Sequence, residues 1–119
     1  ELDSALAGLK KDEAQAVMVQ PSLPRATVAA LAIKHRLPAI APTRPFAGLG
    51  GLAAFSPNQE EIGQRTAVIV DKVLKGRKPA DLPVEQPTRF ELVINLKTAR
   101  AIGLDVPRSV LDRADEVIE

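Results

Sequence analysis

The 119-residue sequence contains no cysteine, no tryptophan and no tyrosine, and only three phenylalanines. Without cysteine the chain can form no disulfide, no thiolate metal site and no cysteine nucleophile. With so few aromatic side chains it offers no platform on which nucleic-acid bases would stack. The formal net charge is +1 and the basic residues are scattered, so the sequence predicts no surface for nucleic acid or anionic lipid.

Long apolar runs are also absent. None approaches the roughly 20 residues that a membrane-spanning helix needs. The hydrophobic content of 45% is nevertheless typical of a globular domain, and 119 residues suffice for one hydrophobic core.

Catalytic and metal-binding motifs are equally scarce. His35 is the single histidine, and without a second histidine or any cysteine a transition-metal site is not expected. The nucleophile motif G-x-S-x-G and the phosphate-binding Walker loop do not occur. Gly48, Gly50 and Ala53 match the spacing G-x-G-x-x-A, but a dinucleotide fingerprint directly follows a strand and opens a helix, which these residues do not. The sequence therefore predicts no catalytic residue, no metal and no cofactor, and a protein that is not an enzyme.

Short apolar runs alternate along the chain with segments of helical periodicity. The expected strands are residues 16–20, 37–40, 51–55 and 90–96, and the expected helices are residues 3–11, 25–36, 59–75, 97–104 and 108–118. Alternating strands and helices favour parallel strands joined by right-handed crossovers. We therefore predict an α/β fold with an open, mostly parallel sheet and helices on both faces.

The first three expected strands end in the same way, with proline followed by a small polar residue. The three pairs are Pro21-Ser22, Pro42-Thr43 and Pro57-Asn58. Parallel strands share one carboxyl edge, and ligands of open α/β sheets bind at that edge. The alternative is that Ser22 and Asn58 only cap helices, and Glu61 three residues after Asn58 resembles a capping box.

Arg44 follows the second of these strand ends, between Thr43 and Pro45. A guanidinium at the carboxyl edge can pair with a ligand carboxylate through two parallel hydrogen bonds. The alternative, which we weigh equally, is a solvated loop arginine. The glycine-rich turn that follows, residues 48–51, would let the backbone approach another group closely.

The helix expected at 59–75 has the clearest pattern in the chain. Apolar residues recur at helical spacing along one side, charged residues occupy the other, and Gly76 ends the helix. Three prolines then predict an extended segment. We divide the chain into an α/β ligand-binding lobe (1–78), a proline-rich tie (79–89) and a C-terminal strand with helices (90–119).

The segment "KGRKPADLPVEQPTRFELVINLKTARAIGLDVPRSVLDRADEVIE" (75–119) resembles the C-terminal end of ABC-transporter substrate-binding proteins. The resemblance is to the branch related to tryptophan/tyrosine-type receptors, and "GGLAAFSPN" (50–58) and "GQRTAVIVDKVLKG" (63–76) are similar too. It implies a type I periplasmic-binding-protein architecture, in which two α/β lobes close on a small solute. This chain would supply the second lobe, and the N-terminal lobe of the same protein would complete the cleft.

The resemblance also implies where the solute binds. Contacts from the second lobe come from loops after the strands and from the glycine-containing turn, which correspond here to Pro21, Ser22, Thr43, Arg44, Gly51, Leu52 and Phe55. Related members often carry Ser-Glu near Thr43-Arg44, so the resemblance does not extend to an aromatic amino acid as the solute. It implies an ABC permease in the membrane as partner, and a periplasmic or lipid-anchored extracytoplasmic location.

These expectations combine into a solute receptor of an ABC importer, of which this chain holds half of the cleft for a small polar or carboxylated organic molecule. The alternative is the ligand-sensing lobe of a transcriptional regulator or two-component receptor, which uses the same fold. With half of the cleft, binding should be weak. The surface that would face the other lobe should favour self-association.

Overall fold

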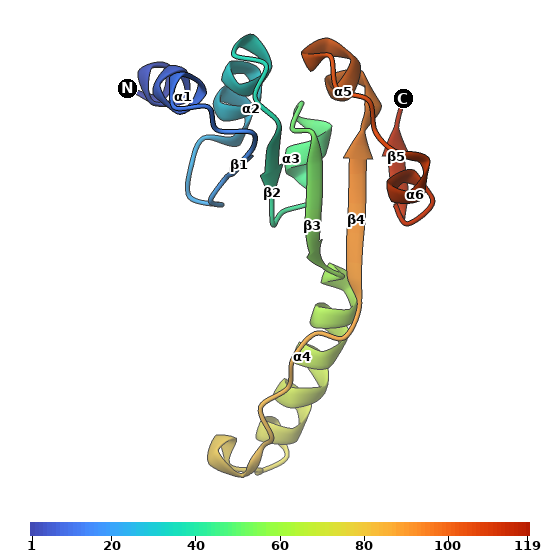
Figure 1. The fold of residues 1–119 in the computed structure, drawn as a ribbon. Helices are drawn as coiled ribbons and strands as arrows, with labels where there is room; N and C mark the ends of the chain where they lie inside the picture. The colour runs from blue at the N-terminus through green and yellow to red at the C-terminus, as the bar shows by residue number, and fades with distance from the viewer. The chain divides into compact units, whose positions relative to one another are not determined.

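The computed structural model describes residues 1–119, which form two compact units. The first unit comprises Glu1–Ser56 with Glu91–Glu119, and the second comprises Pro57–Phe90 (Figure 1). The long helix therefore groups with the proline-rich segment, although the sequence analysis placed it in the lobe 1–78. The role of residues 79–89 as a tie between lobes stays a prediction.

The first unit is built on a five-stranded sheet of order β1-β2-β3-β4-β5. Its strands are β1 (Val17–Met18), β2 (Ala39–Ala41), β3 (Ala53–Pro57), β4 (Phe90–Asn95) and β5 (Glu116–Ile118). The pairs β1/β2, β2/β3 and β4/β5 are parallel. The β4 arrow points opposite to the β3 arrow in Figure 1, so the last two strands enter at the edge where the first three end. The predicted α/β fold with a mostly parallel sheet is confirmed.

The helices of this unit are α1 (Leu2–Lys11), α2 (Arg25–Lys34), α3 (Pro45–Gly48), α5 (Leu96–Ile102) and α6 (Arg108–Leu111). The helix expected at 108–118 was wrong in its second half, which forms β5. Asp115 donates its backbone N–H to the Leu92 carbonyl at 2.8 Å, and its carboxylate accepts from the Leu92 N–H at 2.8 Å. Pairing with β4 therefore prevails over the local helical pattern.

Helix α1 begins one residue earlier than expected, and its N-cap is Glu1. Asp3 lies in the first turn, and its carboxylate contacts the Lys34 ammonium at 2.8 Å and the His35 ring at 2.6 Å. Hydrogen bonds from Lys34 and His35 lower the pKa of Asp3. The Asp3 carboxylate therefore links the first turn of α1 to the end of α2.

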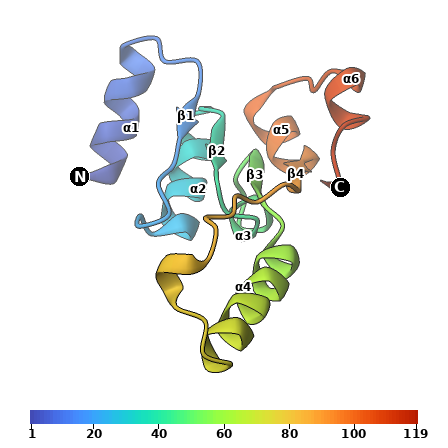
Figure 2. The same ribbon diagram turned by 90° about the horizontal axis from the view of Figure 1, so that it is seen from below.

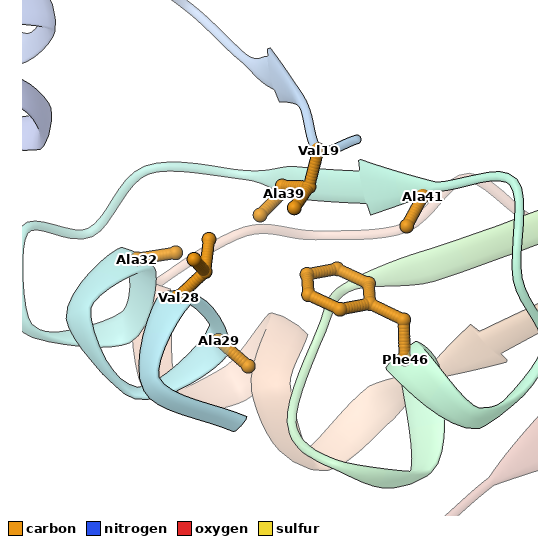
Figure 3. Close-up of a cluster of buried hydrophobic side chains, with 7 residues drawn as sticks. All are labelled: Val19, Val28, Ala29, Ala32, Ala39, Ala41 and Phe46. Atoms are coloured by element: carbon orange, nitrogen blue, oxygen red, sulfur yellow. The ribbon is translucent and has the colours of Figure 1, made fainter. Parts of the chain in front are cut away.

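The main core lies between α2, α3 and the first two strands (Figure 3). Its only aromatic ring belongs to Phe46, which is fully buried against side chains that are mostly alanine. A Cβ added at Gly51 would overlap this ring, so glycine is needed there for the close approach. The cluster consists of Val19, Val28, Ala29, Ala32, Ala39, Ala41 and Phe46.

The second unit contains α4 (Gln59–Leu74), a 3₁₀ turn (Pro79–Asp81) and an extended return segment. As predicted, the Asn58 side chain caps α4 by accepting the Glu61 N–H at 2.8 Å. The Glu61 carboxylate does not complete a capping box but accepts from the Thr88 hydroxyl at 2.7 Å and the Arg89 N–H at 3.1 Å. The Thr88 bond is the main cause that lowers the pKa of Glu61. Gly76 ends the helix at φ +95°, as expected.

The apolar side of α4 is not buried, although its spacing is that of a core-facing helix. No residue of α4 is buried, and Val70 and Leu74 are 49% and 81% exposed. Within this unit the return segment contacts the helix through the charged side chains of Glu61 and Arg65, which lie on a different side of it. No helix of the chain is long and apolar enough to cross a bilayer.

Candidate functional site at the carboxyl edge of the sheet

The carboxyl ends of β1, β2 and β3 lie at one edge of the sheet because these strands are parallel. Pro21 and Ser22 follow β1, and Thr43 and Arg44 follow β2. Phe55 is the central residue of β3 and comes directly after Ala54, which pairs with the last residue of β2. Figure 2 views the chain from this side. Glu116, the first residue of β5, pairs with Val93 of β4, and its side chain reaches this edge through the ion pair with Arg44.

Thr43 carries the least satisfied polar atom of this edge. Its side-chain Oγ1 is buried and has no hydrogen-bond partner, while its carbonyl accepts the Phe46 N–H at 3.0 Å and starts α3. An unpaired buried hydroxyl costs about 1–3 kcal/mol. Because this atom has almost no accessible surface, a ligand could bond to it only after the groups that cover it move.

Arg44 is more than half exposed and already has a carboxylate partner. Its guanidinium forms an ion pair with the Glu116 carboxylate, and the two side chains are 57% and 43% exposed. A pair this exposed contributes at most about 1 kcal/mol, so a competing carboxylate can replace Glu116 at small cost. Sequence reasoning missed Glu116 because it placed that residue in a helix. The β-branched Val117 and Ile118 after it were the available signal for a strand.

Ser22 does not cap α2, since the N-cap is Pro24 and no side chain bonds to the helix start. Pro21 and Ser22 are exposed in a turn closed by the Leu23 N–H on the Gln20 carbonyl at 3.2 Å. The Ser22 hydroxyl can therefore serve a ligand without weakening a helix.

Phe55 supplies a large apolar surface close to these residues. Its side chain is 54% exposed, whereas its neighbours Ala54 and Ser56 are buried. A half-exposed ring beside polar groups is typical of the apolar wall of a small-molecule site.

Gly51 and Leu52 lie at the opposite end of the sheet. The Leu52 N–H donates to the Ala39 carbonyl at 2.9 Å, and its carbonyl accepts from the Asn95 N–H at 2.8 Å. Leu52 packs in a cluster with Ala99 and Ile102, and Gly51 packs against Phe46. These two predicted contacts are therefore not brought together with the other five.

A buried polar network holds α3 and the turn after it in place. The Asn95 amide donates to the Ala47 carbonyl at 2.8 Å, and its oxygen accepts the Thr98 N–H at 3.1 Å as the cap of α5. The Thr98 hydroxyl donates to the Gly50 carbonyl at 2.9 Å. These bonds fix the helix that carries Arg44 at its N-cap. Sequence reasoning missed both residues, although Asn directly before a helical segment is a preferred N-cap residue.

The second unit has an open polar hollow of about 380 Å³. Two carboxylates line it. Glu61 is already bonded to Thr88, Arg89 and Arg65, and Glu60 accepts a hydrogen bond from the Gln64 amide at 3.4 Å. No group of three acidic or histidine side chains is placed to hold a metal ion. The carboxyl edge of the first unit is therefore the better candidate site.

Comparison with known proteins decides the family. Residues 1–118 match the family model described as "ABC transporter substrate binding protein". This chain belongs to that family. The resemblance noted in residues 75–119 is thereby confirmed, and solute binding is the role of the family. No curated protein matches the chain.

Solved structures of the same fold come from three bacteria. A conserved domain protein from Vibrio cholerae matches with TM-score 0.82 at 23% identity, over 98% of this chain and 40% of that one. An ABC domain from Streptococcus pneumonia, in complex with L-Trp, matches with TM-score 0.81 at 30% identity, over 99% of this chain and 42% of that one. The ligand-free, open substrate-binding protein CD0873 from Clostridium difficile matches with TM-score 0.71 at 21% identity, over 99% of this chain and 40% of that one. The chain thus spans about two-fifths of the length of these proteins.

Proposed function

We propose that this chain is part of the solute receptor of an ABC importer and forms one side of the cleft that binds the solute. Membership of the substrate-binding family supports the receptor role. The convergence of three strand ends at one edge of an open sheet supports the location of the cleft. The rest of the receptor would supply the opposite wall.

The proposed solute is a small polar or carboxylated organic molecule. Its carboxylate would bind Arg44 in place of Glu116, and its hydrogen-bonding groups would reach Thr43 and Ser22. Phe55 and Pro21 would contact its apolar part. The observation that carries this proposal is the buried, unpaired Thr43 Oγ1 next to an arginine whose own pair is exposed. Gly51 and Leu52 act through packing and are left out of the contact surface.

The receptor would bind its solute without a chemical step and deliver it to a membrane permease. Delivery to an importer places the receptor outside the cytoplasm, either in the periplasm or held by a lipid anchor. The family assignment supports both statements.

The test is solute binding by the intact receptor, because half a cleft buries too little of a ligand for strong binding. A thermal-shift screen of carboxylated solutes is followed by calorimetry on hits. Arg44→Gln should weaken binding of a carboxylated hit by at least about tenfold, since a charge-assisted pair is lost.

The matched control is Arg108→Gln. Arg108 also pairs with one carboxylate, Asp112 at 2.7 Å, but lies on α6 and is 86% exposed. It should leave the affinity unchanged. Equal affinities for wild type and Arg44→Gln, or an equal loss in both variants, would contradict the proposed site.

A further inference from the structure

Arg44 and Glu116, which form the ion pair at the candidate site, lie 72 positions apart in the chain. Arg44 follows β2 and precedes α3, and its carbonyl accepts the Ala47 N–H at 3.3 Å. Glu116 is the first residue of β5 and pairs with Val93 of β4. Because separate elements hold the two backbones, either side chain can leave the ion pair without moving the backbone of the other.

The ion pair uses only part of the hydrogen-bonding capacity of the two groups. The bond that joins them runs from Nη2 of Arg44 to Oε2 of Glu116. A guanidinium carries further N–H donors and binds a carboxylate best through two parallel bonds. The Arg44 and Glu116 side chains are 57% and 43% exposed, so a dissolved carboxylate can approach the guanidinium while Glu116 is still bound to it.

A solute carboxylate that takes over Arg44 leaves Glu116 charged and close by. Strand pairing fixes the backbone of Glu116, so its carboxylate can withdraw only by the length of its own side chain. Two carboxylates then share one guanidinium. Like charges about 6 Å apart repel strongly enough, even in water, to weaken binding about threefold. A second carboxylate on the solute adds to this repulsion.

We propose that Glu116 is a specificity-determining residue of the receptor. It competes with the solute carboxylate for Arg44, and its charge selects solutes with one carboxylate over dicarboxylates. This inference rests on the proposed function, in which Arg44 binds the carboxylate of the solute. An ion pair as exposed as this one changes the affinity by at most about fivefold. Glu116 therefore weakens the binding of every carboxylate moderately and that of dicarboxylates most.

The test is an NMR titration of the 119-residue chain at neutral pH, which follows the side-chain Nε–H signal of Arg44. Sodium acetate or sodium malonate replaces sodium chloride at constant ionic strength, and the signal is assigned by its loss in Arg44→Gln. Glu116→Gln should lower the acetate concentration at the midpoint by about three- to fivefold, because the competing charge is gone. The malonate midpoint should fall by at least about twice that factor, because malonate carries the second charge.

Asp112→Asn is the matched control. It removes the same charge from another exposed pair, in which Asp112 binds Arg108 at 2.7 Å, and it should leave both midpoints unchanged. The proposal is overturned if Glu116→Gln leaves the midpoints unchanged or raises them, if acetate and malonate shift equally, or if Asp112→Asn gives the same shifts. Acetate and malonate report on Arg44 without the solute. The proposed function fails separately, when Arg44→Gln leaves the affinity of the intact receptor for a carboxylated solute unchanged.

Discussion

At Gly51 the side chain is only a hydrogen atom, and this determines the local packing. The Phe46 ring lies where a side chain at residue 51 would begin, and the ring is the only aromatic group in the main core. Since α3 carries both Phe46 and the N-cap Arg44, the position of this ring also determines the position of the candidate site.

Gly51→Ala should destabilise the chain by about 1–3 kcal/mol, because the added methyl group forces Phe46 from its place. Gly48→Ala is the control, since nothing lies within 4 Å of a Cβ at that position. Urea unfolding of both variants provides the comparison. Similar midpoints would show that the Phe46 ring can move aside freely.

Asp3 provides a pH-dependent contact between α1 and α2. Hydrogen bonds from Lys34 and His35 hold the pKa of Asp3 below its usual value of 3.8. A carboxyl group whose pKa is lowered by folding stabilises the native state above its unfolded pKa, and this contribution is lost as the pH falls through the folded pKa. The thermal midpoint of wild type should therefore exceed that of Asp3→Asn at neutral pH. The difference should begin to shrink as the pH falls toward 3.8 and should vanish once the pH is below the lowered pKa of Asp3. A difference that persists in strong acid would assign the effect to something other than ionisation.

At the scale of elements, the buried Asn95 links three segments. It belongs to β4, caps α5 through its oxygen and donates to the Ala47 carbonyl of α3 through its amide nitrogen. Because the residue is only 5% exposed, water cannot readily replace either bond.

Asn95→Ala should cost about 1–3 kcal/mol, since the Ala47 carbonyl and the Thr98 N–H both lose their partner. Asn95→Ser keeps a cap oxygen and should recover part of the loss. Chemical denaturation of the two variants measures the difference. Equal stabilities of Asn95→Ser and Asn95→Ala would contradict a contribution from the cap.

The elements that the sequence predicted well are those with local causes. Asn58 caps α4 and Gly76 ends it, and these depend on residues within a few positions. Strand β5 was missed because its stability comes from Leu92, which lies far away in the sequence. The candidate site shows the same difference between local and long-range causes. The prolines that end the strands were the sequence signal for Thr43 and Arg44. The ion pair of Arg44 with Glu116 depends on the β4/β5 pairing and could not be predicted.

At the scale of the whole molecule, exposed apolar side chains stand out, among them Val70 and Leu74 of α4, which are 49% and 81% exposed. Such surface favours association when no other partner is present. Exposed apolar side chains elsewhere, such as Val84 at 96%, add to this tendency.

The 119-residue chain should therefore self-associate weakly as its concentration rises, and Val70→Asp should reduce the association. Sedimentation velocity over a concentration series measures this directly. A single monomer boundary at the highest concentration would contradict the prediction, while the full-length receptor should stay monomeric.

The interior between α2 and the first strands is filled largely by Ala29, Ala32, Ala39 and Ala41 around one phenylalanine. Alanine is nearly the smallest side chain, so almost every mutation at these four positions enlarges the residue instead of creating a void. This region should consequently tolerate few amino acids, and variation in the family should be restricted there to glycine, serine and alanine. Adaptation to a new solute would then proceed through the loops, without any redesign of the scaffold beneath them.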